Sequence, residues 1–321
     1  MVVSVKEFDS AKDFLNALVI EGPTPGFNYS GFVFRGVSIG SGENERKLVP
    51  LSLREEKFPE LIKLSGSAEM PASYSSEAAK QEWIQARAEA KVLGSFFRHA
   101  DREGLAMPEI TSRIRQTMQT PGTSDALFNF TVQTRGLWPP DDLLPLAGQA
   151  QHYGLPTRLL DWSRDPWVAA YFSATGALKY SSDSKYKGEK LAVWVLNTEL
   201  LDFEKRLARP KEPIELPLTL ITAPASTNPN LKAQRGVFTV WRPPFVAGTK
   251  QKVDRRPLDE LLEEVFSGYE LKMPLLYKYT LPIDLASELW AVVRHNGVNA
   301  ARIFPGFSGA AKAVMEDAKW K

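Results

Sequence analysis

Residues 149–173 restrict the fold most, because within this segment the chain must leave one helix, form a strand and enter another helix. Gly154 and Pro156 end the first helix, since glycine frees the backbone and proline cannot donate the helical hydrogen bond. The apolar content of 157–162 then predicts a buried strand, and the Asp-Pro pair at 165–166 predicts a new helix start. A strand enclosed by two helices favours a mixed fold of helices and strands.

The same segment carries more polar and aromatic side chains than a packed core requires. His152 and Tyr153 lie at the end of the first helix, and Arg158, Asp161 and Trp162 lie on the strand. Because alternate strand residues share a face, Asp161 points one way and Arg158 with Trp162 the other. We expect a binding site at this junction. The alternative is that Arg158 and Asp161 form a buried ion pair that only braces the strand.

Short strands and helices follow one another elsewhere in the chain without a regular repeat. We predict further strands at 29–36, 191–196, 218–221, 237–241 and 275–281. We predict further helices at 10–20, 77–99, 109–118, 139–152, 257–266 and 283–295, and a terminal helix after a turn within 297–310. These patterns predict one α+β domain over residues 1–321, with a helical insert at about 77–120 after the first core strand. Its core motifs are 29–36, 149–173, 233–241 and 297–310.

Composition and missing motifs argue against several functions. The absence of cysteine excludes thiolate metal sites, and only three histidines argue against a histidine metal site, so no metal is expected. The sequence has no phosphate loop, serine-hydrolase elbow or zinc-protease motif. With 40 basic and 38 acidic residues, no overall field draws the chain to nucleic acid. The basic stretch at 98–115 is diluted by acids, which favours a solvated helical face over a nucleic-acid-binding protein.

The hydropathy of the chain gives no sign of a membrane protein. The N-terminal residues lack a basic stretch followed by a long apolar run, and no later window is apolar enough to cross a bilayer. The sequence therefore predicts a cytoplasmic protein without a membrane partner.

Two positions outside the central segment join the candidate site. Arg35 lies at a strand end before Gly36, where the glycine permits close approach and the guanidinium suits phosphate. A surface ion pair is the alternative role for Arg35. Gln234 precedes another glycine and an aromatic strand, where it can contact a ligand or cap the backbone.

Taken together, these segments resemble the FRG domain family, which is named for its Phe-Arg-Gly triplet. The resemblance rests on residues 34–36, 151–163, 170–173, 234–239 and 303–309. The family's order of elements is similar to the ADP-ribosyltransferase fold, which implies an ADP-ribosyltransferase-like β core. The resemblance also implies an NAD-dependent ADP-ribosyltransferase or NAD-cleaving enzyme, acting as an effector of bacterial antiphage defence or as a toxin.

The resemblance implies a role for each candidate residue, with NAD as the substrate. Arg35 would hold the pyrophosphate, and His152 would hydrogen-bond to a ribose or phosphate oxygen. Tyr153 or Trp162 would stack on nicotinamide. Gln234 would act late in the chain as the third catalytic residue beside Arg35 and His152.

The chain differs from the transferase pattern in its catalytic acidic residue. A catalytic glutamate is expected where this sequence has Gln234. Either Gln234 serves, or Asp161 or Glu288 supplies the charge, and we include Asp161 with Arg158 among the cofactor-binding residues. The alternative is a module that binds a nucleotide, a protein regulator or a protein target without turnover.

Overall fold

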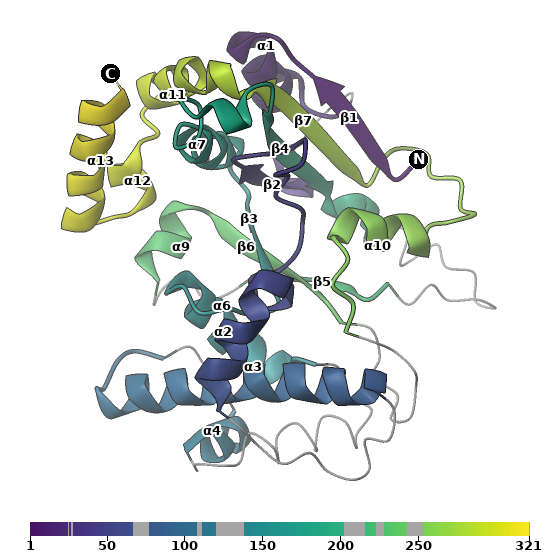
Figure 1. Ribbon diagram of the computed structural model, residues 1–321, viewed down its shortest axis with the longest axis vertical. Helices are drawn as coiled ribbons and strands as arrows, with labels where there is room; N and C mark the ends of the chain where they lie inside the picture. The colour runs from purple at the N-terminus through teal and green to yellow at the C-terminus, as the bar shows by residue number, and fades with distance from the viewer. Residues whose placement is uncertain are drawn as a thin grey trace.

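The computed structural model describes residues 1–24, 26, 28–66, 77–107, 111–119, 138–201, 216–222, 228–242 and 253–320. Within these residues, seven strands form one mixed sheet in the order β1-β7-β4-β2-β3-β6-β5 (Figure 1). The strands are β1 Val3–Glu7, β2 Phe32–Val37, β3 Leu159–Ser163, β4 Lys190–Asn197, β5 Leu218–Ile221, β6 Gly236–Trp241 and β7 Leu276–Pro282. Among these seven strands, β1 and β7 run parallel, and the other neighbouring pairs are antiparallel.

The helices surround this sheet. They are α1 Ala11–Asn16, α2 Phe58–Ser65, α3 Glu77–Arg102, α4 Ser112–Gln119, α6 Leu144–His152, α7 Pro166–Ala177, α9 Pro229–Ala233, α10 Leu258–Val265, α11 Ala286–His295, α12 Ala300–Ile303 and α13 Phe307–Trp320. The mixed α/β class is therefore confirmed, as is a helical insert between β2 and β3. The insert begins earlier than predicted, because α2 precedes α3. Residues 108–110 and 120, where parts of the predicted insert fall, lie outside the described residues.

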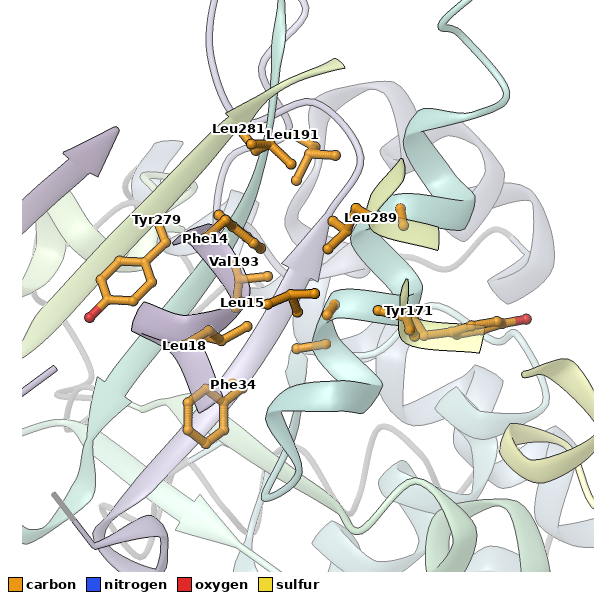
Figure 2. Packing of buried hydrophobic residues seen from close by; sticks show 14 of the residues in the cluster. Phe14, Leu15, Leu18, Phe34, Tyr171, Leu191, Val193, Tyr279, Leu281 and Leu289 are labelled. Atoms are coloured by element: carbon orange, nitrogen blue, oxygen red, sulfur yellow. The ribbon is translucent and has the colours of Figure 1, made fainter. Parts of the chain in front are cut away.

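The main core lies between the sheet and the helices α1, α7 and α11. Figure 2 shows Phe34 and Val193 from neighbouring strands packed near Tyr171 of α7 and Leu289 of α11. All four side chains are almost completely buried. Burial of each such side chain contributes roughly 1.5–3 kcal/mol. A second cluster joins α10 to the sheet through Trp162 and neighbouring apolar residues, so the sheet has apolar contacts on both faces.

Helix starts follow the chemistry that the sequence predicts. The Ser10 hydroxyl accepts a hydrogen bond from the Asp13 amide at 3.3 Å and begins α1, which continues as a π-helical turn at Ala17–Glu21. Asp165 accepts from the Trp167 amide at 3.0 Å and begins α7. The helix predicted from residue 139 begins later: the two prolines at 139–140 precede a 3₁₀ turn at Asp141–Leu143, and α6 starts at Leu144.

Strands β2 and β3 are neighbours, yet they pair at one position only. Phe34 pairs with Ser163, whereas β3 pairs with β6 over the five positions from Leu159 to Ser163. Beyond this pair the two strands diverge. Residues 35–37 of β2 and residues 159–162 of β3 therefore form no ladder hydrogen bonds with each other. Arg35 lies not at the strand end, where the sequence predicts it, but within β2, where it pairs with Trp194 of β4, and its side chain reaches the Asp161 carbonyl oxygen of β3.

Gly36 allows α7 to lie directly on β2. A Cβ atom at this glycine would overlap the Ala169 carbonyl oxygen and would lie 2.8 Å from the Ser173 amide nitrogen. The close approach predicted for this glycine is therefore an approach of helix backbone. It fixes α7 and the strand that carries Arg35 relative to each other.

No helix within the described ranges is both long enough and apolar enough to span a bilayer. Strand β1 and helices α2, α9 and α12 are additions to the elements predicted from the sequence.

Candidate functional site

A cavity of about 440 Å³ lies where β2 and β3 diverge. Its walls include Arg35 from β2, Asp161 from β3, His152 from the end of α6 and Gln234 from the turn before β6. The volume lies within the range of small-molecule sites. With Trp162, five of the predicted site residues thus line one cavity, although they come from segments far apart in the sequence.

Arg35 crosses the opening between the strands. Its Nη1 donates to the Asp161 main-chain carbonyl oxygen at 2.6 Å and lies 2.7 Å from the Asp161 carboxylate. The side chain of Arg35 is only 13% exposed, whereas that of Asp161 is 65% exposed. Arg35 is therefore a largely buried cation that holds a carboxylate at the cavity surface.

Asp161 keeps its negative charge because of this contact. Enclosure by the surrounding protein acts to raise the pKa of the Asp161 carboxyl, but the charge and hydrogen bond of Arg35 outweigh it and lower that pKa below its ordinary value. The Gln151 amide also donates to Asp161 at 3.2 Å. The site therefore presents an ionised carboxylate whose position is fixed by two donors.

The alternative ion pair between Arg158 and Asp161 is wrong, because the two residues have different partners. Arg158 lies 2.6 Å from Glu89 and 2.8 Å from Glu82, both on α3. It lines a separate cavity of about 1020 Å³, whose described walls include none of the other candidate residues. The predicted division of this strand between two faces is confirmed, and it places Arg158 outside the smaller cavity.

His152 is held as a neutral imidazole. Burial lowers the pKa of its ring below the ordinary value of 6.5. Its Nε2 lies 2.9 Å from the Asn230 amide nitrogen, which donates, so the remaining proton is on Nδ1. His152 can therefore donate a hydrogen bond from Nδ1 at neutral pH.

We expect the neutral state of His152 to make stability fall as the pH is lowered. Below its ordinary pKa of 6.5 the unfolded chain binds a proton that the folded chain does not, so stability is lost as pH falls through 6.5 toward the folded pKa. Urea unfolding between about pH 8 and about pH 5 should show this decline. His152→Gln should flatten the curve, while the exposed His295→Gln should not. An unchanged decline in His152→Gln would contradict the assignment.

Gln234 connects the site to the C-terminal region. Its amide donates to the Ile303 carbonyl oxygen at 3.3 Å, and its main-chain oxygen accepts from the Ser163 hydroxyl at 2.7 Å. These contacts tie β3, the turn before β6 and α12 together. Gln234 thus lines the cavity, but its donor nitrogen already has a protein partner.

Trp162 is among the residues that line the cavity, but its buried ring presents little surface for stacking, and Tyr153 does not line the cavity. The Trp162 indole is 3% exposed and donates to the Thr239 hydroxyl at 2.9 Å, within the core on the other face of the sheet. Tyr153 is 64% exposed and its ring contacts His152 edge-on. Phe172 and Phe304 are rings that do line the cavity.

Two arginines in the wall are not among the predicted site residues. Arg46 and Arg54 lie on the connection between β2 and α2 and line the cavity with Arg35. The available sequence signal is limited to three basic residues, Arg46, Lys47 and Arg54, within residues 37–54, which follow the Phe-Arg-Gly triplet. Glu288, considered as a source of charge, is exposed on α11 and does not line the cavity.

The basic stretch at 98–115 is partly neutralised within the described residues. Arg115 lies 2.7 Å from Asp101, and Arg98 donates to the Met118 carbonyl oxygen at 3.0 Å. The hydrogen bond from Arg115 lowers the pKa of Asp101. The ion pair offsets the charge of Arg115, and the hydrogen bond engages one donor of Arg98 without neutralising it.

Comparison with known families identifies one part of the chain. Residues 30–182 match the model of the FRG domain, a range that runs from just before β2 to just beyond α7. The resemblance is therefore confirmed for the segment that contains Arg35, His152 and Asp161. Gln234 and residues 303–309 lie outside the match. No curated protein and no solved structure gives a significant match to the chain.

Proposed function

We propose that the cavity between β2 and β3 binds NAD and cleaves its bond between nicotinamide and ribose. The observation that carries the proposal is the ionised Asp161 carboxylate at the cavity surface, fixed by Arg35. Consumption of NAD would suit an ADP-ribosyltransferase-like effector of antiphage defence or a toxin, as the family resemblance implies.

The proposed chemistry requires negative charge near the ribose. When the bond between ribose C1′ and the nicotinamide nitrogen breaks, its electron pair leaves with nicotinamide and positive charge develops on the sugar. Water or an acceptor group then forms the new bond at C1′ and gives up a proton. The Asp161 carboxylate can accept from a ribose hydroxyl and stabilise the developing charge, while the Nδ1 proton of His152 can bind a ribose or phosphate oxygen.

Asp161, in place of Gln234, supplies the acidic function in this proposal. Gln234 has no charge, and its amide is bonded to Ile303. Asp161 already lies in the cavity and is ionised. We therefore assign the acidic role to Asp161 and a supporting role to Arg35.

Nucleotide binding without turnover is the second candidate function. It is favoured by the internal contacts of the three predicted catalytic side chains: Arg35 with Asp161, His152 with Asn230 and Gln234 with Ile303. A module that only senses a nucleotide would use the same cavity and regulate a protein partner.

Nicotinamide release tests the choice between these functions. Purified full-length protein is incubated with NAD, and free nicotinamide is measured by chromatography. We expect release by the wild type and a loss of about 100-fold or more in Asp161→Asn, because one group that stabilises transition-state charge is removed. Glu288→Gln is the matched control, since it makes the same change outside the cavity.

Folding must be followed in parallel, because Asp161 also holds Arg35. Thermal unfolding of Asp161→Asn distinguishes loss of chemistry from loss of structure. Wild-type release that persists in a folded Asp161→Asn variant overturns the assignment of Asp161. Saturable NAD binding by the wild type without nicotinamide release instead establishes the second function.

A further inference from the structure

Three guanidiniums line one cavity, and they differ in how their charges are neutralised. Arg35 has the Asp161 carboxylate at 2.7 Å. Arg46 donates from Nη2 to the neutral Tyr180 hydroxyl at 2.7 Å and lies over the Tyr180 ring. Arg54 donates from Nε to the Val49 carbonyl oxygen at 3.1 Å. Of these three, only Arg35 therefore has a carboxylate partner among the described residues.

Arg54 has the greatest unmet capacity to bind an anion. Among the described residues, its two terminal nitrogens have neither an acidic partner within 4.0 Å nor a hydrogen-bond acceptor. Burial lowers the pKa of Arg54, and the nearby charge of Arg35 lowers it further. The charges of Glu56 and Asp161 act in the opposite direction, but neither carboxylate forms an ion pair with Arg54 among the described residues. An anion bound directly to the Arg54 guanidinium would therefore offset its burial and the repulsion by Arg35.

The chemistry of a guanidinium selects the kind of anion. Its planar donors match the oxygens of phosphate, and charge-assisted bonds of this type are stronger than neutral ones. Arg35 is hydrogen-bonded and ion-paired to Asp161, so fewer of its donors are available to bind the phosphate, the role that the family resemblance implies for it. Arg46 and Arg54 come from one connecting segment between β2 and α2, so both can contact the same anion at one wall of the cavity.

We infer that Arg54, assisted by Arg46, forms the phosphate subsite of this cavity and binds the diphosphate of a nucleotide ligand. The inference rests on the proposed nucleotide-binding function, but it does not require turnover. It divides the cavity into a phosphate end at Arg54 and Arg46 and a ribose end at Asp161. Arg35 then positions Asp161 and is not the main phosphate ligand.

Calorimetric titration of the full chain with ADP-ribose tests this subsite. ADP-ribose carries the diphosphate and lacks the bond that the enzyme would cleave, so binding is measured apart from chemistry. We expect Arg54→Gln to weaken ADP-ribose binding about 10- to 100-fold and Arg46→Gln to weaken it less. Affinity should also fall with added salt, and this dependence should be shallower in Arg54→Gln.

Arg164→Gln is the matched control. Arg164 belongs to the same region and donates to the Ser30 carbonyl oxygen at 3.4 Å, but it does not line the cavity. Its loss should leave ADP-ribose binding unchanged. Arg54→Lys keeps the charge without the planar fork and should recover part of the affinity.

Thermal unfolding with and without ADP-ribose is a second test, and it distinguishes a ligand-binding role of Arg54 from a structural one. Excess ADP-ribose should raise the Tm of the wild type, because a ligand that binds only the folded state stabilises it. Arg54→Gln should keep or slightly raise its Tm without ligand, since no carboxylate loses a partner and repulsion by Arg35 is removed, and it should lose most of the ligand-induced rise. A large fall in Tm without ligand would instead assign Arg54 a structural role and overturn the subsite.

The failure of this inference is distinguishable from the failure of the proposed function. If ADP-ribose binding depends on Arg54 while no nicotinamide is released from NAD, the phosphate subsite is supported and the proposed NAD cleavage is overturned. If the wild type releases nicotinamide and Arg54→Gln binds ADP-ribose normally, cleavage stands and the subsite is overturned. Absence of ADP-ribose binding to the wild type at millimolar concentration also overturns the subsite.

Discussion

Replacing Arg158 with methionine is expected to lower the free energy of unfolding by about 3–5 kcal/mol, because two carboxylates lose their buried partner. The Arg158 side chain is 7% exposed, and those of Glu82 and Glu89 are 13% and 3% exposed. The nearby carboxylates outweigh burial and raise the pKa of Arg158 above its ordinary value. Methionine fills comparable space but leaves the charges uncompensated.

The expected loss is large because Glu89 also organises neighbouring groups. Its carboxylate accepts from the Ser52 hydroxyl at 2.8 Å, the Gln85 amide at 2.8 Å and the Trp138 indole at 2.6 Å. The network connects α3 to the start of β3, the strand that carries Asp161. Arg158 therefore stabilises the junction between the helical insert and the sheet.

Arg115→Met is the matched control for Arg158→Met. Arg115 also pairs with a carboxylate, but both side chains are substantially exposed. Such surface pairs contribute roughly 0–1 kcal/mol. Urea unfolding of both variants measures the difference. An Arg158→Met variant as stable as the wild type, but defective in ADP-ribose binding, would instead favour a ligand-binding role for Arg158.

Local sequence patterns predict most of the elements around the site. Residues 218–221 have the pattern of a strand and form β5, and the break at Gly154 and Pro156 lies between α6 and β3. These predictions depend on hydrophobic spacing and on backbone chemistry that acts over a few residues. Strand β1 has a weaker signal than β5, the other edge strand, because none of its five residues is buried and three of them are polar or charged.

The partners of charged residues are less predictable. Arg158 and Asp161 are close in sequence and opposite in charge, yet one pairs with α3 and the other with β2. Strand alternation predicts that they point to different faces, but it carries no information about which distant element covers each face. The sequence does not predict Arg54 as a cavity residue for the same reason. Its position in the wall depends on how the connection after β2 folds over the cavity.

Replacing Gly36 with alanine is expected to destabilise the protein by about 3 kcal/mol or more, because the added methyl group has no space. Its Cβ would overlap the Ala169 carbonyl oxygen and would lie 2.9 Å from the carbonyl carbon of the same residue. These are backbone atoms of α7, so the contact cannot be relieved by a side-chain rotation. Either α7 or β2 must move.

Movement of β2 would also disturb the site, since Arg35 directly precedes Gly36. We therefore expect Gly36→Ala to reduce both the Tm and the affinity for ADP-ribose. Gly31→Ala is the matched control, because the closest atoms to the added methyl group there belong to the side chain of the exposed Glu199. That side chain can rotate away at small cost. If Gly36→Ala and Gly31→Ala unfold at the same temperature, the close contact between α7 and β2 is not what requires glycine in the Phe-Arg-Gly triplet.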